Sequence, residues 1–409
     1  MRNIKKIIVA LILASGVVCA GVISVIILSP SHVSFESKIR KLMEKYKIPS
    51  LAAGIVINDS LIWANGFGDQ PDLDTVFMIG SITKTFTATA LLQLNESSKI
   101  SLDKDINAYL PFNVRNPDYP NISITTRMLL SHRSGLARDT PNFQIWYSDN
   151  ETIEWMNENL GTHYKYWEHR PSLAEYLNGT LSLEGLYFDP TIWILEPGTQ
   201  FSYSNLGFEL LGYLVEQITN KSIVDYVQEN LLDPLNMSRT GYDYLEFAGK
   251  NAIPYEWING ENFEFLISNM YTTGASALRS TVSDMVKFMI AHMNQGMVNR
   301  TQILNSGTLE IMREKQSLLT NATTGGFNLI GYGLGWMLYD NRLQGHSGAV
   351  IGYLASLFFK ETENGAFGGI LMFNRGFIHK SDDVLKNIFF PTISKLIFEE
   401  AEHLFNFIS

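Results

Sequence analysis

A serine and a lysine three residues apart are the first side chains whose spacing suggests chemistry. In Ser81-Ile82-Thr83-Lys84, a helix would place Ser81 and Lys84 on one face. A serine hydroxyl is a poor nucleophile until a nearby base takes its proton, and a partly desolvated lysine with a depressed pKa can help. The spacing alone is weak, because Ser101-Leu102-Asp103-Lys104 repeats it. That second copy lies in a polar stretch without apolar periodicity, which we interpret as solvated surface.

Two further motifs follow in order along the chain. Tyr203-Ser204-Asn205 comes after a Pro-Gly turn and enters an amphipathic helical pattern. Y-x-N also occurs at 119, 176 and 339, but without that context. His346-Ser347-Gly348 is the one [KH]-x-G string in the sequence, and it lies on or beside an expected late strand. β-Lactamases and penicillin-binding proteins use three such motifs in this order.

The chain resembles the class C β-lactamase-related serine hydrolases, a group that includes class C β-lactamases, D-alanyl-D-alanine carboxypeptidases, D-aminopeptidases and esterases. The resemblance covers residues 37–375 and also rests on strings that flank the motifs. These strings are MIGSITKTFTA around Ser81, LLSHRSGL at 129–136, GASALRSTVSDMVKF at 274–288 and YGLGW at 332–336. The resemblance implies a serine hydrolase that acts on a small-molecule or peptide substrate. We expect no cofactor, and no metal because neither H-E-x-x-H nor another ligand spacing is present.

By that resemblance, Ser81 attacks the substrate carbonyl and forms an acyl-enzyme. Lys84 and Tyr203 share the work of general base and acid, and the sequence leaves open which of the two takes the first proton. We expect the neighbouring lysine to favour the phenolate form of Tyr203, because an opposite charge lowers the pKa of an acid. Asn205 would orient Lys84 and the substrate amide.

The resemblance also implies an oxyanion hole made by the backbone N–H groups of Ser81 and Ala349, the residue after the His-Ser-Gly motif. Ser347 and Gly348 are implied in substrate binding. Losing one oxyanion donor typically costs on the order of 100-fold in rate.

His346 departs from the β-lactamase pattern, which has lysine at this position. A permanent cation there helps to hold a substrate carboxylate, whereas histidine is mostly neutral at pH 7. The departure favours an ester or peptide substrate over a β-lactam. We include His346 among the catalytic residues and hypothesise that activity depends on its protonation state between pH 5 and 8.

Three other features have both a structural and a functional interpretation. We favour a structural role for His132, a surface position for Arg279, and ordinary core packing for the aromatic residues of 141–195. The alternatives are a catalytic histidine, a ligand for a substrate carboxylate, and a lid or pocket wall. The string from Gly80 to Thr85 lacks the G-K-[ST] core of a phosphate loop, and no G-x-S-x-G nucleophile elbow occurs.

The elements around these residues indicate an α+β fold. Apolar, β-prone runs at 51–57 and 61–65 flank a turn at 58–60, and strand patterns return at 332–339, 354–360 and 368–373. Helical patterns occupy 37–46, 81–94, 208–219, 287–293 and 381–407. Strands at both ends predict one antiparallel sheet built from the N- and C-terminal segments and flanked by helices, with a mostly helical region inserted. We predict a hydrolase domain over 31–409, with an α/β part at 37–80 and 325–409 and a mostly helical part at 81–324.

Residues 1–30 differ from the rest of the chain. Arg2, Lys5 and Lys6 precede an apolar run from Ile7 to Leu28 that is long enough to span a bilayer. We predict a transmembrane anchor, with the catalytic domain outside the cytoplasm. A cleaved signal segment, and hence a secreted protein, is the alternative.

The composition is that of a globular protein, with 45% hydrophobic residues, 18% charged residues and a net charge of −10. An acidic chain argues against nucleic-acid binding. The single cysteine is Cys19, so residues 31–409 contain no disulfide. The leading hypothesis is a hydrolase that acts through an acyl-enzyme on an ester, amide or D-amino-acid peptide. A β-lactamase or D-alanyl-D-alanine carboxypeptidase is the first alternative, and a catalytically silent scaffold is the second.

Overall fold

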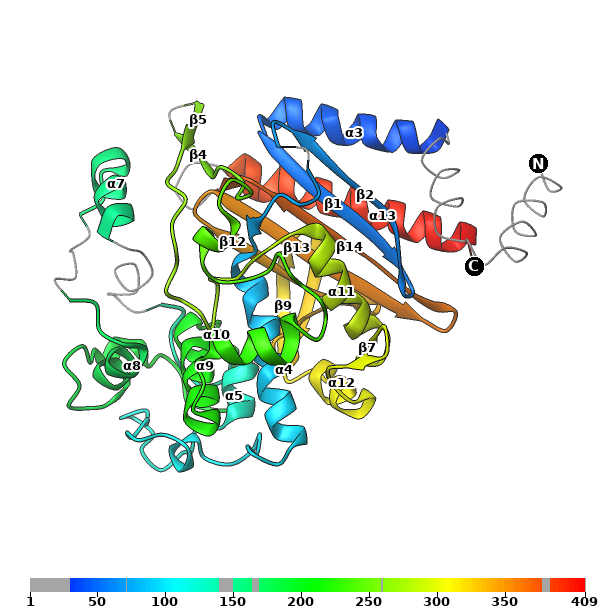
Figure 1. Cartoon of the computed structure of the whole chain (residues 1–409). Coiled ribbons are helices and arrows are strands. Elements are labelled where there is room, and N and C mark those ends of the chain that lie inside the picture. Colours follow the sequence, from blue (N-terminus) through cyan, green and yellow to red (C-terminus); the bar gives the residue numbers. More distant parts are fainter. Residues whose placement is uncertain are drawn as a thin grey trace.

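A twisted antiparallel sheet organises the chain. The computed structural model describes residues 30–70, 72–139, 150–163, 169–258, 260–376 and 383–408. The sheet has eight strands in the order β2-β1-β14-β13-β12-β11-β10-β9 (Figure 1). Their bounds are β1 (Ser50–Ile57), β2 (Ser60–Gly68), β9 (Ser317–Thr324), β10 (Phe327–Tyr332), β11 (Met337–Tyr339), β12 (Leu343–Val350), β13 (Tyr353–Thr362) and β14 (Gly365–Phe373). Since β1 pairs with β14, the predicted sheet built from both ends of the chain is confirmed.

Helices cover both faces of this sheet (Figure 1). On one face lie α3 (Pro30–Tyr46) and α13 (Phe390–Ile408), and α11 (Val282–Met293) contacts β1 and β14 from the other. Further helices are α4 (Thr83–Glu96), α5 (Thr126–Leu130), α7 (Asn150–Leu160), α8 (Leu173–Leu181), α9 (Asn205–Thr219), α10 (Ile223–Val227) and α12 (Ser306–Arg313). Short strands are β3 (Phe77–Met78), β4 (Tyr255–Ile258), β5 (Glu261–Glu264), β6 (Arg279–Ser280), β7 (Met297–Val298), β8 (Thr301–Gln302) and β15 (Arg375–Gly376).

The core is divided by the sheet because successive side chains of a strand point to opposite faces. Leu51, Ala53 and Ile55 of β1 pack in the cluster that contains α3 and α13. Ala52 and Val56 pack in the larger cluster that contains α4, α9 and α11. Every residue of β1 is buried, so this strand belongs to both halves of the core.

Several predicted helices and strands are present, but they begin or end at other residues than predicted. The hairpin at 51–65 is β1 and β2, and Asn58 takes a positive φ of 55° in its turn. The single strand predicted at 332–339 is wrong, because β10 ends at Tyr332 and the chain turns through Gly335, with a φ of 81°, before β11 begins. β9 lies in a stretch that we predicted to be mostly helical. The boundaries proposed within the hydrolase domain stay a prediction.

The prediction of a membrane anchor needs a correction. Its apolar run lies outside the described residues, and Pro30 already begins α3. Across the parts of the chain that the structure describes, no helix is both long and apolar enough to cross a membrane. α3 and α13 instead bury their apolar sides against the sheet. The predicted membrane-anchored location is therefore wrong for the described chain.

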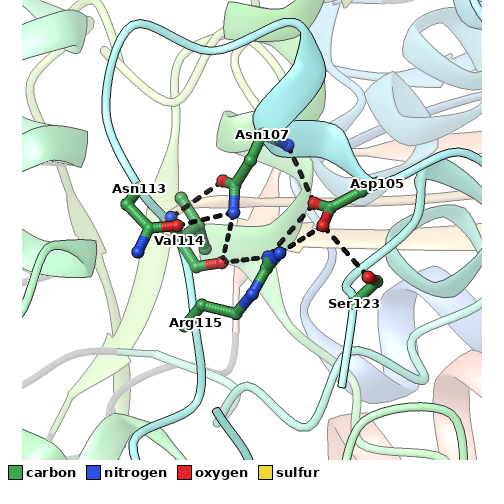
Figure 2. Close-up of polar contacts among 6 residues, drawn as sticks. All are labelled: Asp105, Asn107, Asn113, Val114, Arg115 and Ser123. Carbon is green, nitrogen blue, oxygen red and sulfur yellow. Dashed lines mark hydrogen bonds and ion pairs between the residues drawn. The ribbon is translucent and has the colours of Figure 1, made fainter. Parts of the chain in front are cut away.

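A hydrogen-bonded loop leads into α5 (Figure 2). Arg115 pairs with both carboxylate oxygens of Asp105, while Ser123 Oγ and the backbone N–H of Asn107 each donate to that carboxylate over 3.0 Å. The Asn107 side chain then donates to Asn113 Oδ1 over 2.7 Å. Side chains here satisfy backbone groups that have no partner in regular secondary structure. The hydrogen bond between Ser123 and Asp105 thereby holds the chain in place directly before α5 begins at Thr126.

Candidate active site

Ser81 lies in a tight turn between β3 and α4. β3 pairs with β6, and a 3₁₀-helical turn (Gly80–Ile82) carries Ser81 into the helix. Gly80 has a φ of 52°, and a Cβ at this position would lie 2.8 Å from the backbone nitrogen of Ala349. Glycine is therefore required here both by the backbone angle and by the close approach of β12. The turn leaves Ser81 half-buried, one turn of helix before Lys84.

Lys84 is fully buried, and its ammonium nitrogen has three polar neighbours. Lys84 Nζ lies 3.2 Å from Ser81 Oγ, 2.7 Å from Asn205 Oδ1 and 2.9 Å from the Ala275 carbonyl oxygen. The structure thus brings together the three predicted residues Ser81, Lys84 and Asn205, which come from the turn before α4, from α4 and from α9. Ala275 is a partner that the sequence did not suggest.

Burial lowers the pKa of Lys84 from its ordinary 10.5 to about 7, because a poorly solvated site disfavours the ammonium form. The charges of Glu209 and Asp139 act in the opposite direction and favour the ammonium form. A substantial fraction of the amine is therefore neutral at neutral pH.

Tyr203 lies directly before α9, and its hydroxyl interacts with Ser81 closely enough to affect its pKa. Its ring centroid is 5.0 Å from Lys84 Nζ and 4.2 Å from the ring centroid of His132. Burial raises the pKa of Tyr203 to about 12, and the interaction with Ser81 offsets only part of that rise. The expected phenolate is therefore disfavoured, because the loss of solvation outweighs the effects of Ser81 and of the Arg138 charge.

Asn205 is oriented by contacts on both sides of its amide. Its Oδ1 accepts from Lys84, and its Nδ2 donates to Asp139 Oδ1 over 2.7 Å. The helix begins here because the Ser204 hydroxyl caps it, accepting from the Gly207 N–H over 3.1 Å. His132 Nδ1 accepts from the Ser204 N–H over 3.0 Å, which supports the structural interpretation of His132. No pattern in the sequence pointed to Asp139.

The backbone of β12 lies against the turn that carries Ser81. A Cβ at Gly348 would lie 1.8 Å from the Ile79 carbonyl oxygen and 3.0 Å from the Ser81 nitrogen, so a side chain has no room there. The N–H groups predicted as oxyanion donors, those of Ser81 and Ala349, therefore belong to adjacent backbone segments. Ser347 and Ala349 are half-buried on the side of β12 opposite to His346.

His346 is buried, with 1% of its surface exposed, on the same face of β12 as Gly348, which lies against the turn that carries Ser81. Its Nδ1 donates to the Ser347 carbonyl oxygen over 2.7 Å, and its Nε2 accepts from the Tyr332 hydroxyl over 2.9 Å. Burial, helped by the charge of Lys84, lowers the pKa of His346 to about 3. The imidazole is neutral from pH 5 to 8, so the hypothesis that its protonation controls activity in that range is wrong.

The predictions for Arg279, for the second S-x-x-K string and for the aromatic stretch differ in their outcomes. Arg279 is buried, so its predicted surface position is wrong, and its guanidinium donates to the Ser268 carbonyl oxygen. Ser101 and Lys104 are exposed, as we interpreted them. In the aromatic stretch, Phe143, Trp146, Tyr147, Tyr164, Tyr166 and Trp167 lie outside the described residues, while Tyr176, Tyr187, Phe188 and Trp193 pack in or against the core. Within the described ranges, no group of His, Cys, Asp and Glu side chains could hold a metal ion.

Glu209 is a further residue near Lys84 that the sequence analysis missed. It is fully buried on α9, where it is the one charged residue in the apolar run from Leu206 to Val215. A charged side chain on the inward face of a buried helix costs free energy unless it is paired and hydrogen-bonded. That exception to the helical pattern was the signal that could have identified it.

Comparison with known proteins identifies the family. The model of the Beta-lactamase family matches residues 35–386. "Beta-lactamase-like protein 2" of Dictyostelium discoideum is 28% identical over 313 residues, which are 73% of this chain and 51% of that protein. "Protein flp" of Staphylococcus aureus (strain COL) is 23% identical over 346 residues, 81% of this chain and 61% of that protein. The chain thus spans only about half to three-fifths of the length of these curated relatives.

Solved structures share the fold. The octameric penicillin-binding protein homologue from Pyrococcus abyssi has a TM-score of 0.66 and 24% identity, over 84% of this chain and 73% of that one. The D-stereospecific amidohydrolase from Streptomyces sp. has a TM-score of 0.64 and 24% identity, over 87% of this chain and 98% of that one. Since the family model covers most of the sequence, the chain belongs to the Beta-lactamase family, whose fold is shared by serine hydrolases of several kinds.

Proposed function

We propose that the chain is a serine hydrolase in which Ser81 forms an acyl-enzyme with an ester, an amide or a D-amino-acid peptide. The observation that carries the proposal is the buried Lys84 Nζ, 3.2 Å from Ser81 Oγ. A neutral amine has two N–H bonds and one lone pair. The carbonyl oxygens of Asn205 and Ala275 can accept both N–H bonds, which leaves the lone pair directed at the serine hydroxyl.

In the first step, Lys84 takes the proton of Ser81 while the serine oxygen bonds to the substrate carbonyl carbon. The carbonyl oxygen becomes an anion, which the N–H groups of Ser81 and Ala349 stabilise. The pKa of about 7 supports Lys84 as the base, because a base works best when its pKa is near the operating pH. Tyr203, with a pKa of about 12, remains a neutral hydroxyl that can donate.

The remaining steps use the same groups. As the tetrahedral intermediate collapses, the bond to the leaving group breaks, and the Tyr203 hydroxyl passes a proton to it. The Lys84 ammonium then gives Tyr203 the proton that it took from Ser81, which lies between them. Water then attacks the acyl carbon, gives its proton to Lys84, and releases the acid as Ser81 recovers its own proton. Each proton taken up is given back, so the enzyme is regenerated.

The choice among substrates follows from His346. A neutral imidazole that is buried and bonded to Tyr332 offers no cation to a substrate carboxylate. This supports an ester, an amide or a D-amino-acid peptide over a β-lactam, in line with the D-stereospecific amidohydrolase among the similar structures. A β-lactamase or D-alanyl-D-alanine carboxypeptidase is the alternative within the same family.

The test is the intact mass of the protein after exposure to a fluorophosphonate, and separately to a penicillin. Ser81→Ala is compared with Ser101→Ala, which removes the serine of the exposed second S-x-x-K string. We expect a fluorophosphonate adduct on the native chain and on Ser101→Ala, and none on Ser81→Ala. A stable penicillin adduct as well would favour the carboxypeptidase alternative. A folded native sample without any adduct would make a silent scaffold the better description.

A further inference from the structure

Glu209 is a buried acid for which the proposed reaction has no direct use. The side chain is fully buried on α9, and its Oε2 accepts from the backbone N–H of Gly274 over 3.4 Å. Among the described residues, its Oε1 has no hydrogen-bond partner. A carboxyl group with so few partners is expensive to bury, because the water that it loses is not replaced. Such a group therefore calls for an explanation beyond packing.

The Gly274–Ala275 segment connects Glu209 to Lys84. On the side of α4, the Gly274 carbonyl accepts from Thr87 Oγ1 over 2.7 Å and the Ala275 carbonyl accepts from Lys84 Nζ over 2.9 Å. On the side of α9, the N–H of Gly274 points to Glu209. A Cβ at Gly274 would lie 2.3 Å from the Phe208 carbonyl oxygen, so the segment lies directly on α9. The orientation of the carbonyl that holds Lys84 is thus coupled to Glu209.

The same two residues interact through their charges. The Glu209 carboxylate favours the ammonium form of Lys84, and burial raises the pKa of Glu209 to about 8. Other groups also face this pair: Asp139 and Arg138 influence Lys84, the neutral imidazoles of His132 and His346 lie near it, and Tyr242 lies near Glu209. Of these groups, Glu209 has the largest charge effect on Lys84.

From this geometry we propose that Glu209 is a positioning residue for Lys84. Its carboxyl group holds the peptide segment that accepts the lysine hydrogen bond, so that the Ala275 carbonyl stays directed at Lys84 Nζ when Lys84 takes the proton of Ser81. Glu209 does not touch the substrate or the reacting atoms. The inference rests on the proposed function, because Lys84 matters only if Ser81 is the nucleophile.

The test is the rate of fluorophosphonate labelling of Ser81 as a function of pH in Glu209→Gln. Glutamine keeps the shape and a carbonyl acceptor for Gly274 but removes the charge. Because the pKa of Glu209 is about 8, its carboxyl is mostly protonated at the pH where Lys84 titrates, so we expect the acid limb and the plateau rate to stay near those of the native chain. Glu256→Asp is the matched control for shortening a buried acid: Glu256 is also buried and accepts from a glycine N–H, that of Gly352, but does not contribute to the pKa of Lys84.

A second variant, Glu209→Asp, keeps the charge but withdraws the carboxylate from Gly274. We expect its acid limb to stay near the native pH while the plateau rate falls several-fold. The inference is overturned if Glu209→Asp has the native plateau, if Glu209→Gln lowers the plateau as much as Glu209→Asp does, or if Glu256→Asp lowers it equally. A native chain that is not labelled at any pH would instead refute the proposed function, so the two failures are distinguishable.

Discussion

At the scale of single residues, burial acts in opposite directions on Lys84 and Tyr203. Low solvation disfavours whichever form carries charge, so it lowers the pKa of the lysine and raises that of the tyrosine. The lysine consequently titrates near neutral pH and the tyrosine far above it. This difference separates the roles of two groups that the sequence left interchangeable, and it favours Lys84 as the first base.

We therefore predict that labelling of Ser81 requires the neutral form of Lys84. The labelling rate should fall as the pH drops below about 7, in step with protonation of the amine. Lys84→Met removes the base and should lower the rate at pH 8 by about 100-fold or more. The measurement is the pH profile of the labelling rate, followed by mass spectrometry.

His346→Gln is the control for this profile. His346 has a pKa of about 3, so it is already neutral throughout the range and its replacement should leave the acid limb in place. If the limb vanished in His346→Gln but persisted in Lys84→Met, the assignment of the base to Lys84 would be refuted.

Contacts between residues close in the sequence could be predicted better than the burial and protonation state of individual side chains. The i, i+3 spacing of Ser81 and Lys84 was enough to predict their contact, because helix geometry is local. That His346 stays neutral down to pH 5 could not be predicted in the same way. It depends on burial by Tyr332 and other residues brought in by tertiary packing, which no local pattern encodes. Glu209 became meaningful only once the 274–275 segment was seen against α9.

At the scale of elements, the contact between β12 and the turn that carries Ser81 sets the distance between the two proposed oxyanion donors. Gly348→Ala would insert a methyl group 1.8 Å from the Ile79 carbonyl oxygen and force these segments apart. We expect the turnover or labelling rate to fall by about 100-fold or more, because the donors would no longer converge on one oxygen.

Gly307→Ala is the matched control for this substitution. Gly307 lies in α12, and a Cβ there meets no other atom within 4 Å. The alanine should leave the labelling rate unchanged and stabilise the helix slightly. A Gly348→Ala protein that is folded and labels at the native rate would contradict the proposed oxyanion hole.

The loop before α5 gives a second prediction at this scale (Figure 2). Asp105→Asn should lower the free energy of unfolding by about 2 kcal/mol at pH 7, because the carboxylate accepts charge-assisted hydrogen bonds from Arg115. Burial alone would raise the pKa of Asp105, but the hydrogen bonds from Arg115, Asn107 and Ser123 outweigh it and lower the pKa. Urea unfolding of both proteins at several pH values measures the effect.

The direction of the pH dependence follows from that lowered pKa. Stabilisation by the Asp105 carboxylate is present above the unfolded-state pKa of about 4 and disappears as the pH falls through the lower native pKa. Asp103→Asn is the control, because Asp103 is mostly exposed in its pair with Arg127 and should cost less than about 1 kcal/mol. Equal losses for the two variants at pH 7 would contradict the assignment of the loop's stability to Asp105.

Elements were predicted well where the local pattern determines them and poorly where long-range pairing does. The β1–β2 hairpin follows from two apolar runs around Asn58, a residue that tolerates a positive φ. β9 has an unremarkable sequence from Ser317 to Thr324 and is a strand because it pairs with β10 at the sheet edge. The strand conformation of β9 depends mainly on its pairing with β10. A short stretch of sequence does not reveal that pairing.

At the scale of the whole molecule, the sheet makes the two ends of the chain depend on each other. β1 pairs with β14 over its length, with Leu51 opposite Phe373 and Ile57 opposite Phe367. One face of these strands packs on α13, and the other packs on α11 and the large cluster that contains α4. Ser81 precedes α4, so the geometry of the site depends on a core to which both termini contribute.

The last prediction is that the site and the far face of the sheet unfold together. Ile397 on α13 is fully buried on the face opposite to α4, and Ile397→Ala should lower the free energy of unfolding by about 2–5 kcal/mol. In guanidinium, far-UV circular dichroism and competence for Ser81 labelling should be lost in one coincident transition, which this variant moves equally for both. Ile311→Ala, at a position that is 38% exposed on α12, should shift neither by more than about 0.5 kcal/mol. If labelling competence instead survived the transition that Ile397→Ala shifts, the sheet and the site would be separate cooperative units, contrary to the shared packing of β1 and β14.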